Sequence, residues 1–140
     1  MQTRMVPVEG GRHSAEVVEA GSGPDLVFLH GAGGLNWDPF LEALSQQFHV
    51  VAPRMAGTGA STGDEEVLDH HDAFYYLLDA IDGAGVGDAV LVGHSMGGWL
   101  AAELAAMQPG RFKKLVLISP AGLWNDAYPV FDFFMYRNMP

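Results

Sequence analysis

A serine stands between two glycines at residues 93–97, where the sequence runs Gly-His-Ser-Met-Gly. The G-x-S-x-G pattern is typical of enzymes whose serine attacks a carbonyl carbon, provided that a strand precedes it and a helix follows it. Both are expected here, because residues 89–92 form an apolar run and residues 96–107 are rich in alanine with leucines at helical spacing. We therefore identify Ser95 as a candidate catalytic nucleophile.

The neighbours of Ser95 suit a tight strand-to-helix turn. Gly93 and Gly97 leave no side chains where the backbone is crowded, and Gly97 begins a stripe of small residues with Ala101 and Ala105 that lets the helix approach the sheet. The free amides at the helix N-terminus would stabilise an oxyanion beside the serine. The structural alternative is an ordinary glycine-rich turn without catalytic chemistry.

His94 is a tempting general base because it adjoins the serine. Side chains of adjacent residues diverge at such a turn, so we do not expect His94 to hydrogen-bond to Ser95. We expect it to pack beside the strand.

A second glycine-rich segment follows the apolar run 26–29. Its residues are His30, Gly31, Ala32, Gly33 and Gly34. Small residues at the end of a strand allow backbone N–H groups to face a ligand. A dinucleotide-binding loop is the alternative, but its pattern requires a glycine at position 36, where the sequence has asparagine.

The surrounding elements predict an α/β fold. Apolar runs without alternation, typical of buried parallel strands, occur at 26–29, 50–52, 90–92 and 115–118. Between and after these runs, apolar residues at helical spacing predict helices at 37–44, 74–81 and 100–107. Asn36 is a possible N-cap of the first helix, and residues 55–66 are expected to form a loop. Residues 4–8 and 13–18 predict an antiparallel hairpin at one edge of the sheet. Helices are expected on both faces.

Composition limits the class of partner. The net charge of −10 argues against nucleic acid and anionic membranes, and the absence of cysteine excludes disulfides and thiolate chemistry. No apolar run reaches the length of a membrane span, so we expect a cytoplasmic protein. We predict no cofactor and no metal: His70 and His71 should diverge by about 100° on a helix and form a solvated face with Asp72.

The combination of His30-Gly31-Ala32-Gly33 with Gly-His-Ser-Met-Gly-Gly resembles the α/β-hydrolase superfamily, as do the loop 57–61 (GTGAS) and the segment 111–122 (RFKKLVLISPAG). The resemblance implies that the backbone N–H groups of Ala32 and Met96 form an oxyanion hole. His30, Gly31, Gly33, Gly93, His94 and Gly97 are the remaining motif residues. One departure is the segment 53–57 (PRMAG), where relatives often carry an aspartate and a proline before the first glycine.

The same resemblance predicts a triad in which an acid and a histidine follow the serine along the chain. All six histidines precede Ser95: His13, His30, His49, His70, His71 and His94. After the helix expected at residues 96–107, the only acidic residues are Asp126 and Asp132. We expect a truncated form: residues 1–120 are the N-terminal part of the core domain and 121–140 begin a cap. Such a chain should be a feeble hydrolase. Its strand 115–118 should be an exposed edge that allows self-association.

The leading interpretation is a serine hydrolase that, when complete, acts on ester-like or ketone carbonyls of a small molecule with a hydrophobic acyl part. Carboxylesterase, carbon–carbon bond hydrolase and cofactor-free haloperoxidase chemistry all remain open. A serine in place of aspartate argues against a dehalogenase or an epoxide hydrolase. The alternative is a non-catalytic protein that binds a small ligand on the same scaffold.

Overall fold

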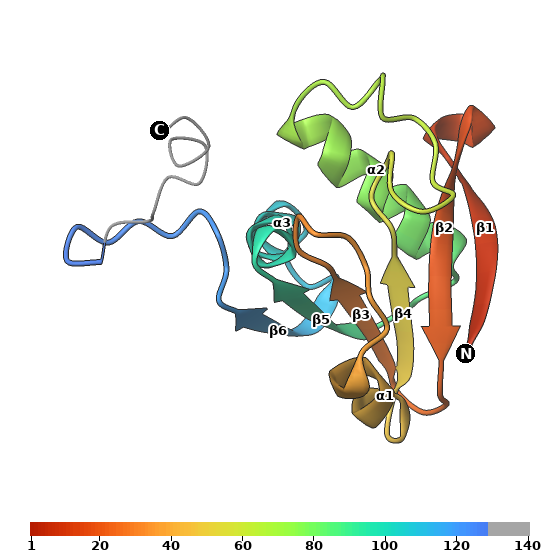
Figure 1. Ribbon diagram of the computed structural model, residues 1–140, viewed down its shortest axis with the longest axis horizontal. Helices are drawn as coiled ribbons and strands as arrows, with labels where there is room; N and C mark the ends of the chain where they lie inside the picture. Colours follow the sequence, from red (N-terminus) through yellow and green to blue (C-terminus); the bar gives the residue numbers. More distant parts are fainter. Residues whose placement is uncertain (129–140) are drawn as a thin grey trace, which may run out of the picture.

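The computed structural model describes residues 1–128. Six strands and three helices follow one another in an order that alternates after the initial hairpin (Figure 1). The elements are β1 (Gln2–Val8), a 3-10 turn (Glu9–Gly11), β2 (His13–Ala20), β3 (Asp25–Leu29), α1 (Pro39–Ser45), β4 (His49–Pro53), α2 (His70–Gly83), β5 (Ala89–His94), α3 (Met96–Met107) and β6 (Phe112–Ile118).

The sheet confirms the predicted α/β class. Its strand order is β1-β2-β4-β3-β5-β6. The first hairpin joins β4 in antiparallel orientation, whereas β4, β3, β5 and β6 are parallel. The carboxyl ends of β3 and β5 therefore lie side by side, with Leu29 opposite Gly93. This adjacency brings the loop after β3 next to the turn after β5.

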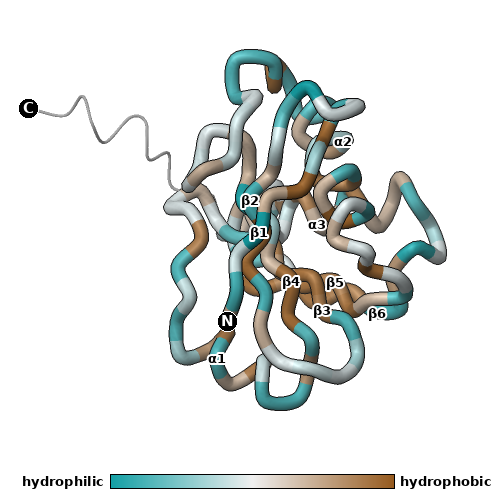
Figure 2. Tube along the Cα trace, turned by 90° about the vertical axis from the view of Figure 1, so that its right-hand side faces the viewer, coloured by the Kyte–Doolittle hydropathy of each residue, from teal (hydrophilic) through white to brown (hydrophobic). Residues whose placement is uncertain are grey.

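Two apolar layers cover the two faces of the sheet, as the runs without alternation predict. On one face, α2 and α3 pack on a cluster that includes Val27, Leu29 and Leu91. On the other face, α1 packs on a cluster that includes Leu26 and Phe28. Successive residues of β3 thus point to opposite cores, and Figure 2 shows the hydrophobic colour concentrated on the central strands.

Helix α1 begins later than the sequence suggested. Its N-cap is Asp38, whose side chain accepts hydrogen bonds from the amides of Phe40 and Leu41, and not Asn36. Both residue types cap helices well, but Pro39 fixes the first helical position and selects the residue before it. Phe40, expected on the buried face, is 45% exposed.

Strand β6 is the edge opposite β1 (Figure 1). The three apolar residues Leu115, Val116 and Leu117 are exposed, in agreement with the predicted unpaired edge. Leu123, Trp124 and Tyr128 after it are also exposed. The rest of the aromatic segment and most of the predicted cap, residues 129–140, lie outside the described residues.

Candidate active site

Ser95 occupies the sharp bend between β5 and α3. Its backbone has φ 55° and ψ −119°, a left-handed conformation that a residue with a side chain adopts at a cost of about 1–3 kcal/mol. The bend is held from both sides: the Ser95 amide donates to the Ile118 carbonyl at 3.0 Å, and the Ser95 carbonyl accepts from the Ala121 amide at 2.9 Å. The residue is half-buried, so its side chain is not enclosed in the core.

Glycines make this bend possible by letting backbone segments touch. A methyl group on Gly93 would collide with the carbonyl of Gly97, and one on Gly97 would collide with the carbonyls of Leu29 and His30. Helix α3 therefore lies directly against the carboxyl end of β3. This is the crowding that the spacing of the two glycines around Ser95 predicts.

The loop after β3 lies against the serine. A methyl group built on Gly31 would be 3.2 Å from Cβ of Ser95 and 3.4 Å from Nδ1 of His94. The amides of Ala32 and Met96, predicted as the oxyanion hole, donate no hydrogen bond to any other described residue. They are therefore available to a ligand. Gly33, by contrast, faces open space, so close packing does not require a glycine there.

The buried side chain of His30 fixes the loop that follows β3. Its ring is 2% exposed, with Nδ1 2.8 Å from the Gly31 carbonyl and Nε2 3.2 Å from the Met55 amide. Because an amide can only donate, Nε2 is the acceptor and Nδ1–H donates to Gly31. Burial lowers the pKa of His30 and keeps the ring in this neutral form. The neutral ring thus ties the loop that carries Ala32 to the loop after β4.

Arg54, the departure from the family pattern, holds the same two loops. Its guanidinium donates to the Leu35 carbonyl at 2.9 Å, and its Nε lies 3.3 Å from Oε2 of Glu16. Glu16 in turn accepts from the Ala60 amide at 2.6 Å. An arginine at this position therefore fits the loop without disturbing the bend at Ser95.

An apolar cavity of about 310 Å³ opens beside the loop and the bend. Ala32 and Met96 both border it, although Ser95 itself does not. Most of its wall is apolar and comes from α2, α3 and the loop after β4: Met55, Val67, Leu77, Trp99 and Leu100. The sequence did not indicate this cavity, because its walls come from segments that are far apart along the chain.

His94 differs from its prediction. It is exposed and not packed beside the strand, and it borders a separate hollow of about 200 Å³ with Phe28 and Ile118. Position 94 is the last residue of β5, where it pairs with Ile118 of β6, and its side chain is exposed.

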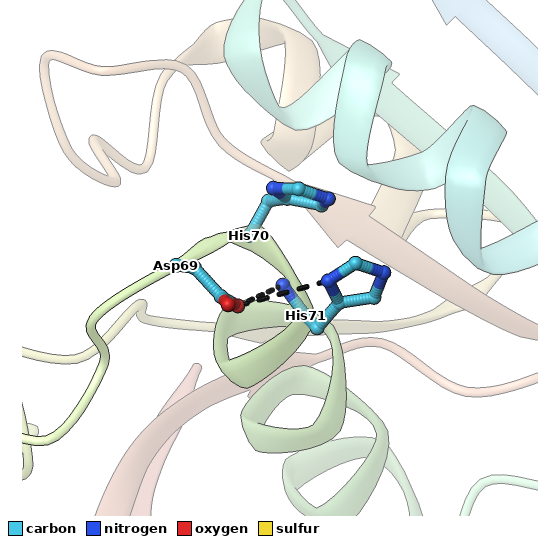
Figure 3. Close-up of side chains that lie close together, drawn as sticks. All are labelled: Asp69, His70 and His71. Atoms are coloured by element: carbon cyan, nitrogen blue, oxygen red, sulfur yellow. Dashed lines mark hydrogen bonds and ion pairs between the residues drawn. The ribbon is translucent and has the colours of Figure 1, made fainter.

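Asp69, His70 and His71 gather at the start of α2 (Figure 3). The two rings are 4.1 Å apart at their centroids, and one potential ligand atom from each of the three residues lies within 4.8 Å of the other two, so the expected divergence of the histidines was wrong. Asp69 is the N-cap, and its bonds from the Asp72 and His71 amides lower its pKa. All three cluster residues are exposed, and only His70 borders the cavity.

A second histidine–carboxylate pair lies at the far end of the strands. Nδ1 of His49 is 2.8 Å from Oδ1 of Asp25, and both residues begin their strands. Because Ser95 follows the carboxyl end of β5, the length of the sheet separates it from this pair. The pair cannot act as the base and acid of a Ser95 triad.

Comparison with known proteins agrees with this geometry. The family model described as "Alpha/beta hydrolase family" matches residues 26–139, which includes both the loop after β3 and the bend at Ser95. The chain belongs to the alpha/beta hydrolase family.

Individual members of the family that resemble the chain have different activities. A 2-hydroxymuconate semialdehyde hydrolase from a Pseudomonas species is 32% identical over 80% of the chain and 41% of its own length. A solved bacterial membrane phospholipase A is 31% identical with a TM-score of 0.80, covering 89% of this chain and 41% of that one. An epoxide hydrolase from Vigna radiata is 30% identical with a TM-score of 0.74, covering 83% and 39%.

This α/β hydrolase chain spans about 40% of the length of these three proteins. These proteins are all hydrolases, but they act on different substrates, so the comparison does not identify one substrate for this chain. Among residues 1–128, no helix is long and apolar enough to cross a membrane.

Proposed function

We propose that Ser95 is the nucleophile of a serine hydrolase that acts on ester-like or ketone carbonyls, with the N–H groups of Ala32 and Met96 as the oxyanion hole. The observation that carries the proposal is the strained bend, in which Ser95 adopts φ 55° beside Gly31. Strain of this kind persists where the surrounding structure imposes it, and it is concentrated at functional sites.

In the proposed reaction the Ser95 hydroxyl attacks the substrate carbonyl, and the developing oxyanion accepts hydrogen bonds from the two free amides. Loss of the leaving group gives an acyl-enzyme, which water then hydrolyses. Preorganised amides of this kind contribute about 3–4 kcal/mol each to transition-state stabilisation. The cavity beside Ala32 and Met96 would take the apolar acyl part.

Among the described residues, no side chain forms a hydrogen bond with the Ser95 hydroxyl. No histidine follows Ser95 in the 140 residues, and His30, though close, donates to Gly31 and accepts from Met55. An unassisted serine hydroxyl is a weak nucleophile. We infer that the 140-residue chain reacts slowly and that a base from elsewhere would complete the enzyme.

A non-catalytic ligand-binding protein is the second candidate, favoured by a cavity that is already formed by the described residues. This candidate predicts ligand binding without any covalent reaction at Ser95.

A fluorophosphonate probe with mass-spectrometric mapping tests the first candidate against the second. We expect slow labelling, over hours, that is confined to Ser95 and absent from Ser95→Ala. The matched control is Ser119→Ala, because Ser119 is exposed and also has a positive φ of 43°, but no oxyanion loop has been assigned to it.

Labelling in the Ser119→Ala variant should equal that of the parent chain. Adducts on other serines, or none after a day, would contradict the nucleophile and favour the binding protein. Complete labelling of Ser95 within minutes would contradict the absence of a base.

A further inference from the structure

The cavity beside the oxyanion loop has an unusual charge balance. Four of its lining side chains can ionise: His30, Asp64, His70 and Tyr76. No lysine or arginine borders it. Burial disfavours the charged forms of His30 and Tyr76, so both are neutral near pH 7. Within residues 1–128, Asp64 is the one carboxylate that lines this cavity.

Asp64 is exposed and lies against the turn at Gly57. A methyl group built on Gly57 would be 2.8 Å from Cβ of Asp64 and 3.3 Å from its Oδ2, so the side chain lies directly on this turn. Among the described residues no lysine, arginine or histidine pairs with Asp64 within 4.0 Å. Its negative charge is therefore uncompensated at the mouth of the cavity.

Arg54 is a cation close enough to the cavity to act on His30 electrostatically. Its guanidinium is already engaged by the Leu35 carbonyl and by Glu16, and it does not border the cavity. His70 stands at the rim beside Asp69, the carboxylate that caps α2. Among residues 1–128, no lysine or arginine therefore borders the cavity to offset the charge of Asp64.

We propose that the cavity selects an uncharged apolar group on the carbonyl substrate and rejects one that ends in a carboxylate. This inference rests on the proposed function for the position of the carbonyl, beside Ala32 and Met96. At about 30 Å³ for each non-hydrogen atom, roughly the volume of a water molecule in the liquid, the cavity takes about ten atoms. A straight chain of six to eight carbons or a single substituted ring fits that size.

Two methyl ketones that differ only at the far end test the proposal: 2-octanone and 7-oxooctanoate. Both would be titrated calorimetrically into Ser95→Ala, which removes the nucleophile but keeps the cavity. We expect 2-octanone to bind at least about tenfold more tightly than 7-oxooctanoate, because like charges repel and the carboxylate loses its hydration. Asp64→Asn, made in the same Ser95→Ala background, should remove most of this difference, whereas Glu103→Gln, on an exposed part of α3, should not.

Filling the cavity localises the binding. Ala73 borders the cavity and Ala106 is exposed on α3, so Ala73→Phe should abolish binding of 2-octanone and Ala106→Phe should leave it unchanged. Equal or tighter binding of 7-oxooctanoate, or 2-octanone binding that survives Ala73→Phe, would overturn the proposal. Because these titrations do not need the serine, they are independent of the labelling that tests the nucleophile.

Discussion

Gly31 lies close beside Ser95 although 64 positions separate them in the sequence. A methyl group on Gly31 would stand 3.2 Å from Cβ of Ser95, closer than an ordinary van der Waals contact. The parallel pairing of β3 with β5 brings them together, with Leu29 opposite Gly93. The proposed nucleophile and its oxyanion loop are thus positioned by the sheet register and not by the local sequence alone.

The first prediction follows from this contact. Gly31→Ala should push the loop and Ser95 apart by a few tenths of an ångström and slow fluorophosphonate labelling about tenfold, because covalent chemistry is sensitive to such displacement. Gly33→Ala is the matched control, since a methyl group there would contact nothing. Equal labelling rates for the two variants would show that the Gly31 contact is irrelevant to reactivity.

A second prediction concerns the contact between α3 and β3. Gly97→Ala should lower the free energy of unfolding by about 1–3 kcal/mol or more, because the methyl group would collide with rigid backbone carbonyls. Gly87→Ala, in open space, should change it by less than about 0.5 kcal/mol. Urea denaturation measures both, and similar stabilities for the two variants would refute the close approach.

The buried ring of His30 predicts a pH dependence of stability. Burial lowers the pKa of His30 in the folded chain below the ordinary histidine value of 6.5, so the unfolded chain binds the proton more tightly. The contribution of the neutral His30 ring to the free energy of unfolding is therefore complete above about pH 6.5. It is lost as the pH falls towards the pKa of His30 in the folded chain, by up to about 1.4 kcal/mol for each pH unit. His30→Gln, which does not titrate, should show a shallower decline between pH 6.5 and 5.

Urea denaturation at several pH values gives the two slopes. Other histidines contribute equally to both proteins, so the difference between them isolates His30. Parallel curves for the parent chain and His30→Gln would show that the ring is not held neutral by burial.

Sequence reasoning succeeded where the determinants are local. The bend at Ser95 was predictable because Gly93 and Gly97 flank it between an apolar run and a helical one. The N-cap of α1 was missed because Asn36 and Asp38 are both good caps and Pro39 decides between them. The exposure of His94 was missed because it depends on what covers the end of β5.

The cavity and its charge could not be predicted, because they depend on long-range packing. The hydrogen bond from the Met55 amide to His30 joins two loops that follow different strands, and the position of Asp64 depends on the turn at Gly57. Neither contact leaves a signal in residue types or spacing.

The exposed edge of β6 gives a further prediction. Unpaired apolar strands recruit other chains, so we propose that the 140-residue chain self-associates in a concentration-dependent way through Leu115, Val116 and Leu117. Val116→Lys should shift sedimentation equilibrium towards the monomer. Leu68→Lys, which replaces an exposed leucine away from the sheet, should not. A parent chain that is monomeric at high concentration would contradict the proposal.

The most direct test of the central claim is a crystal structure of the chain after prolonged reaction with a fluorophosphonate. We predict that the phosphonyl group is bonded to Oγ of Ser95 and that its oxygen lies within about 3.1 Å of the amide nitrogens of both Ala32 and Met96. A phosphonyl oxygen that points into solvent, or a Ser95 bend relaxed to an ordinary φ, would contradict the account.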